Sequence, residues 1–168
     1  QGVGSVFSVT LPFERSSYDI PLSTQNDTTD DAEASLMGCR VLIVDDSEIN
    51  LELAKGMAED LGVTVDIALS GRAALDQLDT MSGAYDVILM DLQMPEMDGF
   101  ETTQRLHQHT NGSNTPVLAV SADVTDEQYD KALSVGMVGF LGKPFSHHQL
   151  AASLKSVLNQ QAPSFTNK

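Results

Sequence analysis

The stretch Asp86–Phe100, DVILMDLQMPEMDGF, decides the fold of this chain. Four apolar residues run directly into Asp91, and Pro95 and Gly99 then prevent a regular strand from continuing. A short, continuous apolar run of this kind is typical of a strand that is buried on both faces of a parallel sheet. A carboxylate at the end of such a strand is held rigidly, so Asp91 is the first candidate for chemistry.

Four further segments resemble this strand, and helical patterns alternate with them. The expected strands cover residues 40–46, 63–69, 85–91, 116–122 and 138–144, and the helices begin near residues 48, 71, 99, 125 and 147. Ile49, Leu53, Met57 and Leu61 recur at helical spacing, as on the apolar face of an amphipathic helix. The alternation predicts an α/β fold, a flavodoxin-like, doubly wound five-stranded parallel sheet of order 2-1-3-4-5 with five helices.

The chain divides into four zones. Residues 1–13 alternate apolar and polar side chains and predict a strand, whereas residues 14–37 are rich in Ser, Thr, Asn and Asp and predict a flexible linker. Residues 38–160 carry the α/β pattern, and residues 161–168 form a loose polar tail. The chain begins at Gln1 without an initiator methionine, so we expect a fragment of a longer protein.

Composition limits the partners of this chain. The formal net charge of -15 repels a nucleic-acid duplex or an anionic membrane, so we expect neither as a direct partner. Metal ions and basic protein surfaces are the natural complements of such a charge. The one cysteine, Cys39, excludes an internal disulfide and a cysteine-rich zinc site, which fits a reducing compartment.

Polar residues stand at the carboxyl ends of four expected strands. These residues are Asp45, Asp46, Asp91, Ser121 and Lys143. In the order 2-1-3-4-5, the first and third strands flank the switch point where ligands bind, so their three carboxylates crowd together. Two charges about 4 Å apart cost ~4 kcal/mol at an effective dielectric of roughly 20, so the cluster holds a proton or attracts a cation.

The chemistry of these groups suits phosphoryl transfer. Hard oxygen ligands with open positions suit Mg²⁺. A carboxylate can attack phosphorus to form an acyl phosphate, and the Lys143 ammonium can neutralise the charge of the transferred group. Ser121 can donate a hydrogen bond to a phosphoryl oxygen.

Four motifs carry a resemblance to a known family, and they stand in its order and at its spacing. They are VLIVDDSEIN, DVILMDLQMPEMDGF, VLAVSAD and GFLGKPF, at residues 41–50, 86–100, 117–123 and 139–145. Over residues 38–160 the chain resembles the receiver domain of two-component response regulators. The resemblance implies that Asp91 accepts a phosphoryl group from a phosphohistidine. It also implies that Asp46, Asp91 and the Gln93 backbone carbonyl bind Mg²⁺, or Mn²⁺ in its place, and that Asp45 acts through a metal-bound water.

The same resemblance assigns roles to residues near the last two strands. Ser121 and Lys143 are expected to hold the phosphoryl oxygens, and the Lys143–Pro144 peptide bond is expected to be cis. Phe140 stands where the family has its rotameric aromatic switch. It lacks the hydroxyl of the tyrosine that many relatives carry, so any switch hydrogen bond through that hydroxyl is lost.

A second resemblance concerns the first zone. The sequence GVGSVFSVTLPF, residues 2–13, resembles the last hairpin of a histidine kinase ATP-binding domain. Its place before a linker and a receiver implies a hybrid sensor histidine kinase as the parent, anchored in the bacterial inner membrane with the receiver in the cytoplasm. The ATP-binding glycine boxes and the phosphorylated histidine helix are missing, so this fragment is not expected to be a kinase.

The implied partners are a phosphohistidine-bearing kinase dimerisation domain, a histidine phosphotransfer protein, or both, and we expect the fragment to be monomeric. One alternative function is a Mg²⁺-dependent phosphatase with an aspartyl-phosphate intermediate. Such enzymes usually carry a second Asp two residues after the nucleophile, where this chain has Gln93. The other alternative is an interaction module that never turns over phosphate, and the complete set of Asp46, Asp91, Ser121 and Lys143 argues against it.

Overall fold

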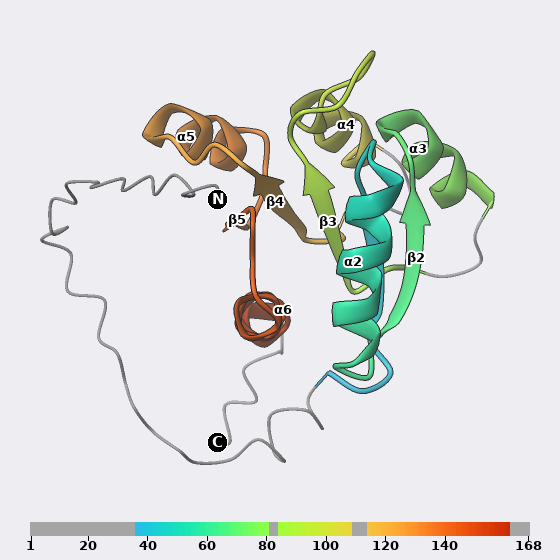
Figure 1. Cartoon of the computed structure of the whole chain (residues 1–168). Coiled ribbons are helices and arrows are strands. Elements are labelled where there is room, and N and C mark those ends of the chain that lie inside the picture. Colours follow the sequence, from blue (N-terminus) through green and yellow to red (C-terminus); the bar gives the residue numbers. More distant parts are fainter. Residues whose placement is uncertain (1–35, 81–83, 109–113, 162–168) are drawn as a thin grey trace, which may run out of the picture.

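A five-stranded parallel sheet forms the centre of the computed structural model, which describes residues 36–80, 84–108 and 114–161 (Figure 1). The strands are β1 (Arg40–Val44), β2 (Thr64–Ala68), β3 (Val87–Asp91), β4 (Val117–Ser121) and β5 (Gly139–Gly142). Their spatial order is β2-β1-β3-β4-β5, and every neighbouring pair is parallel. This order confirms the predicted 2-1-3-4-5 sheet.

Helices cover both faces of the sheet. They are α2 (Glu48–Glu59), α3 (Gly71–Thr80), α4 (Gly99–Leu106), α5 (Asp126–Ser134) and α6 (His147–Gln161). Side chains of α2 and α6 join one buried cluster, and side chains of α3, α4 and α5 join the other. Successive residues of a strand point to opposite faces, so Val41 faces the first cluster and Leu42 the second. The central strands β3 and β4 are fully buried, as their continuous apolar sequences predict.

Capping residues begin the helices close to the strand ends. The side chain of Ser47 accepts from the backbone N–H of Asn50, and that of Asp98 accepts from the N–H of Glu101. Such caps satisfy N–H groups that the first turn leaves without partners. These caps therefore fix where α2 begins after β1 and where α4 begins after β3.

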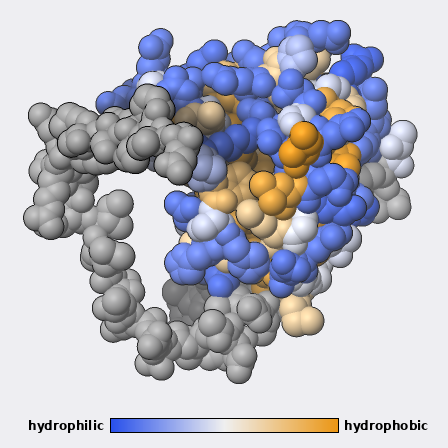
Figure 2. Space-filling view, in the orientation of Figure 1, coloured by the Kyte–Doolittle hydropathy of each residue, from blue (hydrophilic) through white to orange (hydrophobic). Residues whose placement is uncertain are grey.

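The sequence prediction for the buried face of α2 was wrong for Ile49 and Leu53, although Met57 packs against the core and Leu61 is buried. Ile49 is 81% exposed and Leu53 is 60% exposed, whereas Leu51, Ala54 and Ala58 face the sheet. The alanines also recur at helical spacing, and their small side chains let α2 lie close to β1. Figure 2 shows hydrophobic side chains on the surface over α2, among hydrophilic neighbours.

Element boundaries differ slightly from those that the sequence predicts. The observed strands are two or three residues shorter, and Leu36, which the predicted linker includes, is fully buried in the core. The predicted strand at residues 1–13, residues 14–35 of the linker and residues 162–168 lie outside the described residues. In the part of the chain that is described, no helix combines the length and the apolar composition that a membrane span requires.

Candidate functional site

Three carboxylates gather at the carboxyl edge of the sheet, as the sequence predicts. Asp45 and Asp46 follow β1 directly, and Asp91 is the last residue of the neighbouring β3. Each carboxylate offers an oxygen, and these oxygens lie within 4.8 Å of one another. Asp45 and Asp91 are buried, at 4% and 6% exposure, whereas Asp46 is exposed to solvent. The cluster is therefore open on one side.

Lys143 bridges two of these carboxylates from the end of β5. Its Nζ lies 2.5 Å from Oδ2 of Asp45 and 2.7 Å from Oδ2 of Asp91. The backbone N–H of Lys143 donates to the Ser121 carbonyl oxygen, which fixes the residue at the edge of the sheet. The Lys143–Pro144 bond is cis, as expected. A single ammonium group thus compensates two buried negative charges.

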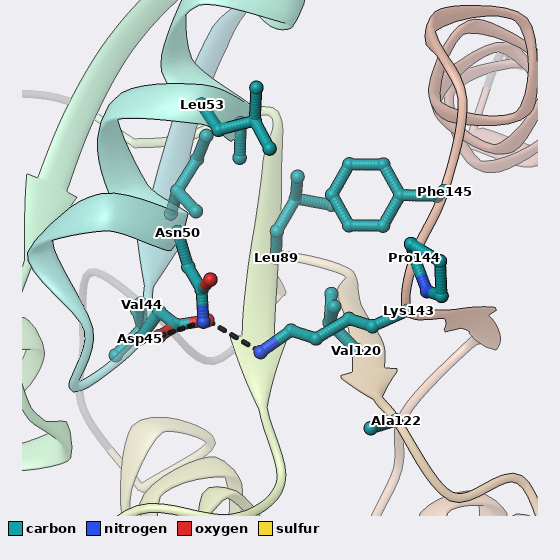
Figure 3. Close-up of a pocket in the computed structure, with 12 residues that line it drawn as sticks. Val44, Asp45, Asn50, Leu53, Leu89, Val120, Ala122, Lys143, Pro144 and Phe145 are labelled. Carbon is teal, nitrogen blue, oxygen red and sulfur yellow. Dashed lines mark hydrogen bonds and ion pairs between the residues drawn. The ribbon is translucent and has the colours of Figure 1, made fainter. Parts of the chain in front are cut away.

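Asp45 has further donors besides Lys143. Its Oδ1 accepts from the backbone N–H of Ser47 at 2.9 Å, and Asn50 Nδ2 lies 3.1 Å from Oδ1 and 3.3 Å from Oδ2. Figure 3 shows the Asn50 and Lys143 side chains converging on Asp45. Asn50 did not appear among the sequence-predicted site residues. The signal that points to it is a short amide side chain in the first helical turn after a carboxylate strand end.

The environment shifts the pKa values of the bridge in a consistent way. Burial by itself raises the pKa of Asp45, but hydrogen bonds from Lys143, Ser47 and Asn50 bring it below its ordinary value. Burial lowers the pKa of Lys143, but its bonds to Asp45 and Asp91 raise it above the ordinary value. At neutral pH the bridge is therefore an ammonium held by at least one carboxylate.

Asp91 behaves differently from Asp45. Burial raises its pKa, and the negative charge of Asp45 adds to this, although bonds from Lys143 and the Gln93 N–H oppose the shift. The pKa of Asp91 lies above its ordinary value as a result. The ionised form is therefore less stabilised at Asp91 than at Asp45, and an additional cation at the site favours the ionisation of Asp91.

The loop after β3 folds back against Asp91. The Gln93 N–H donates to Oδ1 of Asp91 at 3.0 Å, and the Gly99 N–H donates to the Leu92 carbonyl at 3.2 Å. Glu96 has a φ of 65°, in the left-handed region that glycine favours. This turn brings Gly99 so close to Asp91 that a Cβ there would lie 2.2 Å from the Asp91 carbonyl oxygen.

Ser121 and Phe140 lie on the side of the site nearest α5. Ser121 is fully buried, and its Oγ donates to the Asp123 carbonyl at 3.1 Å and accepts from the Asp123 N–H at 3.2 Å. The hydroxyl therefore bonds to its own loop. Phe140 is half-buried on β5, and its ring centroid lies 6.3 Å from that of Tyr129 on α5.

An apolar pocket of about 240 Å³ adjoins the acidic cluster. Leu53 of α2 and Phe145 of the loop before α6 line it, and Asp45 and Lys143 stand at its polar end (Figure 3). The pocket therefore joins the exposed part of α2 to the bridge between Lys143 and the carboxylates.

The donor set fits a hard divalent cation. Carboxylate oxygens are the ligands that Mg²⁺ prefers, and a partly open cluster leaves room for the waters that Mg²⁺ retains. The exposed carboxylate of Asp46 offers an approach from solvent. The described residues thus suit Mg²⁺, and Mn²⁺ has similar requirements.

The fold and the acidic edge are those of the receiver-like α/β domains that the sequence motifs resemble. Residues 41–155 match the family described as the response regulator receiver domain. This match covers more than half of the chain, and the chain belongs to that family.

Curated relatives include sensor kinases. The aerobic respiration control sensor protein ArcB of Escherichia coli is 32% identical over 162 residues, which cover 96% of this chain and 20% of ArcB. The signal transduction histidine-protein kinase BarA of Escherichia coli is 36% identical over 126 residues, which cover 75% of this chain and 14% of BarA. The chain thus spans a fifth or less of the length of these two relatives.

Solved structures with a similar fold include a chemotaxis protein and a kinase receiver domain. The chemotaxis protein CheY4 of Vibrio cholerae matches with a TM-score of 0.68 and 32% identity, over 72% of this chain and 99% of CheY4. The receiver domain of a Pseudomonas aeruginosa sensor histidine kinase matches with a TM-score of 0.66 and 29% identity, over 73% of this chain and 98% of that chain. The latter is described with a magnesium ion coordinated in its active site cleft.

Proposed function

We propose that this chain is a phosphoacceptor module of a two-component phosphorelay and that Asp91 accepts the phosphoryl group. The observation that carries the proposal is the Lys143 bridge, which places one ammonium against both Asp91 and Asp45 at an edge with a third carboxylate. Membership of the receiver family supports the same role. A phosphatase of this kind usually has a second Asp where this chain has Gln93, and a phosphate-independent binding module needs no such complete set, so neither alternative is favoured.

In the proposed reaction, a carboxylate oxygen of Asp91 attacks the phosphorus of a phosphohistidine. The new O–P bond forms as the P–N bond breaks, and the electron pair of the P–N bond returns to the imidazole nitrogen of the donor. The carboxylate must be ionised to attack, and it is already held at the end of a rigid strand. The Lys143 ammonium stays near the transferred group and neutralises its added charge.

We assign the metal site to residues around the same carboxylates. Asp46, Asp91 and the Gln93 carbonyl would hold Mg²⁺, and Asp45 would act through a bound water. The cation supplies charge neutralisation to the phosphoryl oxygens when it is bound. The crowding of three carboxylate oxygens within 4.8 Å supports this assignment, because neighbouring negative charges favour a bound cation.

The same proposal implies a conformational change that passes from Asp91 towards α5. A phosphoryl oxygen is a stronger acceptor than a backbone carbonyl, so Ser121 exchanges its bond to Asp123 for one to the phosphoryl group. That exchange releases the loop after β4 and leaves room for Phe140 to change rotamer beside Tyr129. The output is a changed surface around α5 and β5.

The proposed phosphodonor docks beside the acceptor. Ile49 and Leu53 are exposed on α2, and Leu53 also lines the apolar pocket that ends at Lys143. A donor must bring its histidine to Asp91, so apolar residues next to the acceptor favour a protein partner with an apolar helix. A kinase dimerisation domain or a histidine phosphotransfer protein supplies such a surface.

The parent protein is proposed to be a hybrid sensor histidine kinase. The similarity to ArcB covers almost the whole chain, including the segment before the receiver. In that setting the receiver lies in the cytoplasm below a membrane-anchored kinase, acts as a monomer, and passes its phosphoryl group to a histidine phosphotransfer protein or controls the kinase.

Intact-protein mass spectrometry tests the proposal. The chain is incubated with acetyl phosphate and Mg²⁺, with and without EDTA, and Asp91→Asn is treated in parallel. We expect the wild type to gain one phosphoryl group only when Mg²⁺ is present, and the variant to gain none. A wild type that neither gains mass nor binds Mg²⁺ contradicts the proposal.

A further inference from the structure

Asn50 connects helix α2 to the acidic cluster. It lies three residues after the helix cap Ser47, and its side chain reaches back to the end of β1. The single Nδ2 group lies 3.1 Å from Oδ1 and 3.3 Å from Oδ2 of Asp45, so it faces both oxygens of that carboxylate (Figure 3). The amide therefore restrains the rotation of the Asp45 side chain as well as its position.

In the described part of the chain, Asn50 is one of two side chains that donate to Asp45. The other is Lys143, whose ammonium is shared with Asp91. The third donor is the backbone N–H of Ser47, which reaches Oδ1 alone. If Lys143 leaves Asp45, Asn50 is the donor that remains at Oδ2 among the described residues, and a carboxylate that is only 4% exposed cannot turn to bulk water instead.

The proposed phosphorylation of Asp91 would create this situation. A phosphoryl group adds negative charge beside Lys143 and competes with Asp45 for the shared ammonium. A neutral amide is suited to hold Asp45 at that stage, because it fixes the carboxylate without cancelling the charge that attracts a metal ion. A second cation in its place would compete with the metal for the same oxygens.

We propose that Asn50 is a positioning residue that keeps Asp45 oriented towards the divalent cation when Lys143 is drawn to the phosphoryl group. This inference rests on the proposed function, since it assumes a cation at the cluster. Asn50 acts through Asp45 and touches neither the cation nor the reacting atoms. Its contribution is largest when Lys143 no longer donates to Asp45.

A double-mutant cycle tests this role through metal binding alone. Asn50→Leu removes the amide at nearly constant volume, and Lys143→Met mimics the withdrawal of the ammonium from Asp45. The Kd for Mg²⁺ is measured by calorimetry, and that for Mn²⁺ by electron paramagnetic resonance of the free ion, without a phosphodonor. Asn159→Leu, an exposed position of α6, is the matched control in both backgrounds.

We expect Asn50→Leu to weaken metal binding about tenfold in the Lys143→Met background and by less than half that factor when Lys143 is present. Asn159→Leu should leave the Kd unchanged in both backgrounds. The free energy of unfolding in EDTA is measured first. Asn50→Ser, whose hydroxyl is too short to reach Asp45, replaces Asn50→Leu if the latter does not fold.

Two results overturn the inference and leave the proposed function intact. One is an Asn50→Leu substitution that leaves the Kd for Mg²⁺ unchanged, both when Lys143 is present and in the Lys143→Met background. The other is an equal loss of affinity with and without Lys143, which shows that Asn50 does not take over from the lysine. A wild type that binds no Mg²⁺ contradicts the inference and the proposed function together.

Discussion

Gly99 lies against the main chain of Asp91, and a side chain at Gly99 would reach to 2.2 Å from the Asp91 carbonyl oxygen. The two residues are joined by the loop that turns back at Glu96 and by the hydrogen bond from Gly99 to Leu92. The start of α4 is thus packed onto the backbone of the proposed acceptor. A change at Gly99 therefore acts on the position of Asp91.

Gly99→Ala should destabilise the fold by about 2 kcal/mol, because the new Cβ meets backbone atoms that cannot move aside. It should also slow phosphorylation by acetyl phosphate, since relief of the clash displaces Asp91. Gly56→Ala is the control, because a Cβ at that exposed helix position meets nothing within 4 Å. It should stabilise by about 0.5–1 kcal/mol. Urea unfolding measures both, and equal effects of the two variants would refute the packing argument.

Asp91→Asn should stabilise the metal-free protein at neutral pH by about 1 kcal/mol, because it removes a carboxylate that is unfavourable when ionised. The pKa of Asp91 is raised in the folded state, so its ionised form opposes folding above the folded pKa. Below the unfolded pKa of about 3.9 the carboxyl is neutral in both states, and the gain disappears. Urea unfolding in EDTA at several pH values measures the gain. A gain that grows as the pH falls would show that the sign is wrong.

Lys143→Met should destabilise the metal-free protein by about 2 kcal/mol at pH 7, because two buried carboxylates lose their shared cation. Saturating Mg²⁺ should restore most of this loss, since the metal replaces the ammonium as a positive charge at the cluster. Lys155→Met, a lysine of α6, is a matched control for the loss of one positive charge. Thermal unfolding with and without Mg²⁺ measures the recovery, which should be absent in the control.

Replacing the exposed apolar residues of α2 should separate a small phosphodonor from a protein donor. The donor protein is a phosphohistidine protein that phosphorylates the wild type. In the double variant Ile49→Ser/Leu53→Ser, the rate of transfer from this protein should fall far more than the rate of phosphorylation by acetyl phosphate. We expect at least a fivefold slower transfer from the protein, about 1 kcal/mol of lost docking energy. Leu133→Ser, an exposed leucine of α5, is the control. Equal transfer rates for the three proteins would place the docking surface elsewhere.

The sheet order and the strand-end residues were predictable because each depends on a local pattern. A continuous apolar run that ends in a carboxylate specifies a buried parallel strand and its functional edge, and the predicted cluster of Asp45, Asp46 and Asp91 does form. The cis bond at Lys143 was expected from the family resemblance and is present. The roles assigned to these residues remain predictions.

Other features depend on packing that the sequence pattern does not specify. Ile49 and Leu53 fit a helical apolar face, but Ala54 and Ala58 fit another, and close approach to the sheet favours the smaller side chains. Leu36 lies in a polar segment and is nonetheless buried, because the chain turns back there, where Gly38 bonds to Gly62. A long-range contact of this kind leaves no local periodicity to detect.

Chemical localisation of the phosphoryl group tests the central claim most directly. After incubation with acetyl phosphate and Mg²⁺, borohydride reduces an aspartyl phosphate to homoserine, and peptide sequencing by mass spectrometry locates the reduced residue among Asp45, Asp46 and Asp91. The account predicts homoserine at position 91 alone, and no reduction in Asp91→Asn. Homoserine at position 45 or 46 in the wild type would contradict the assignment of Asp91 as the acceptor.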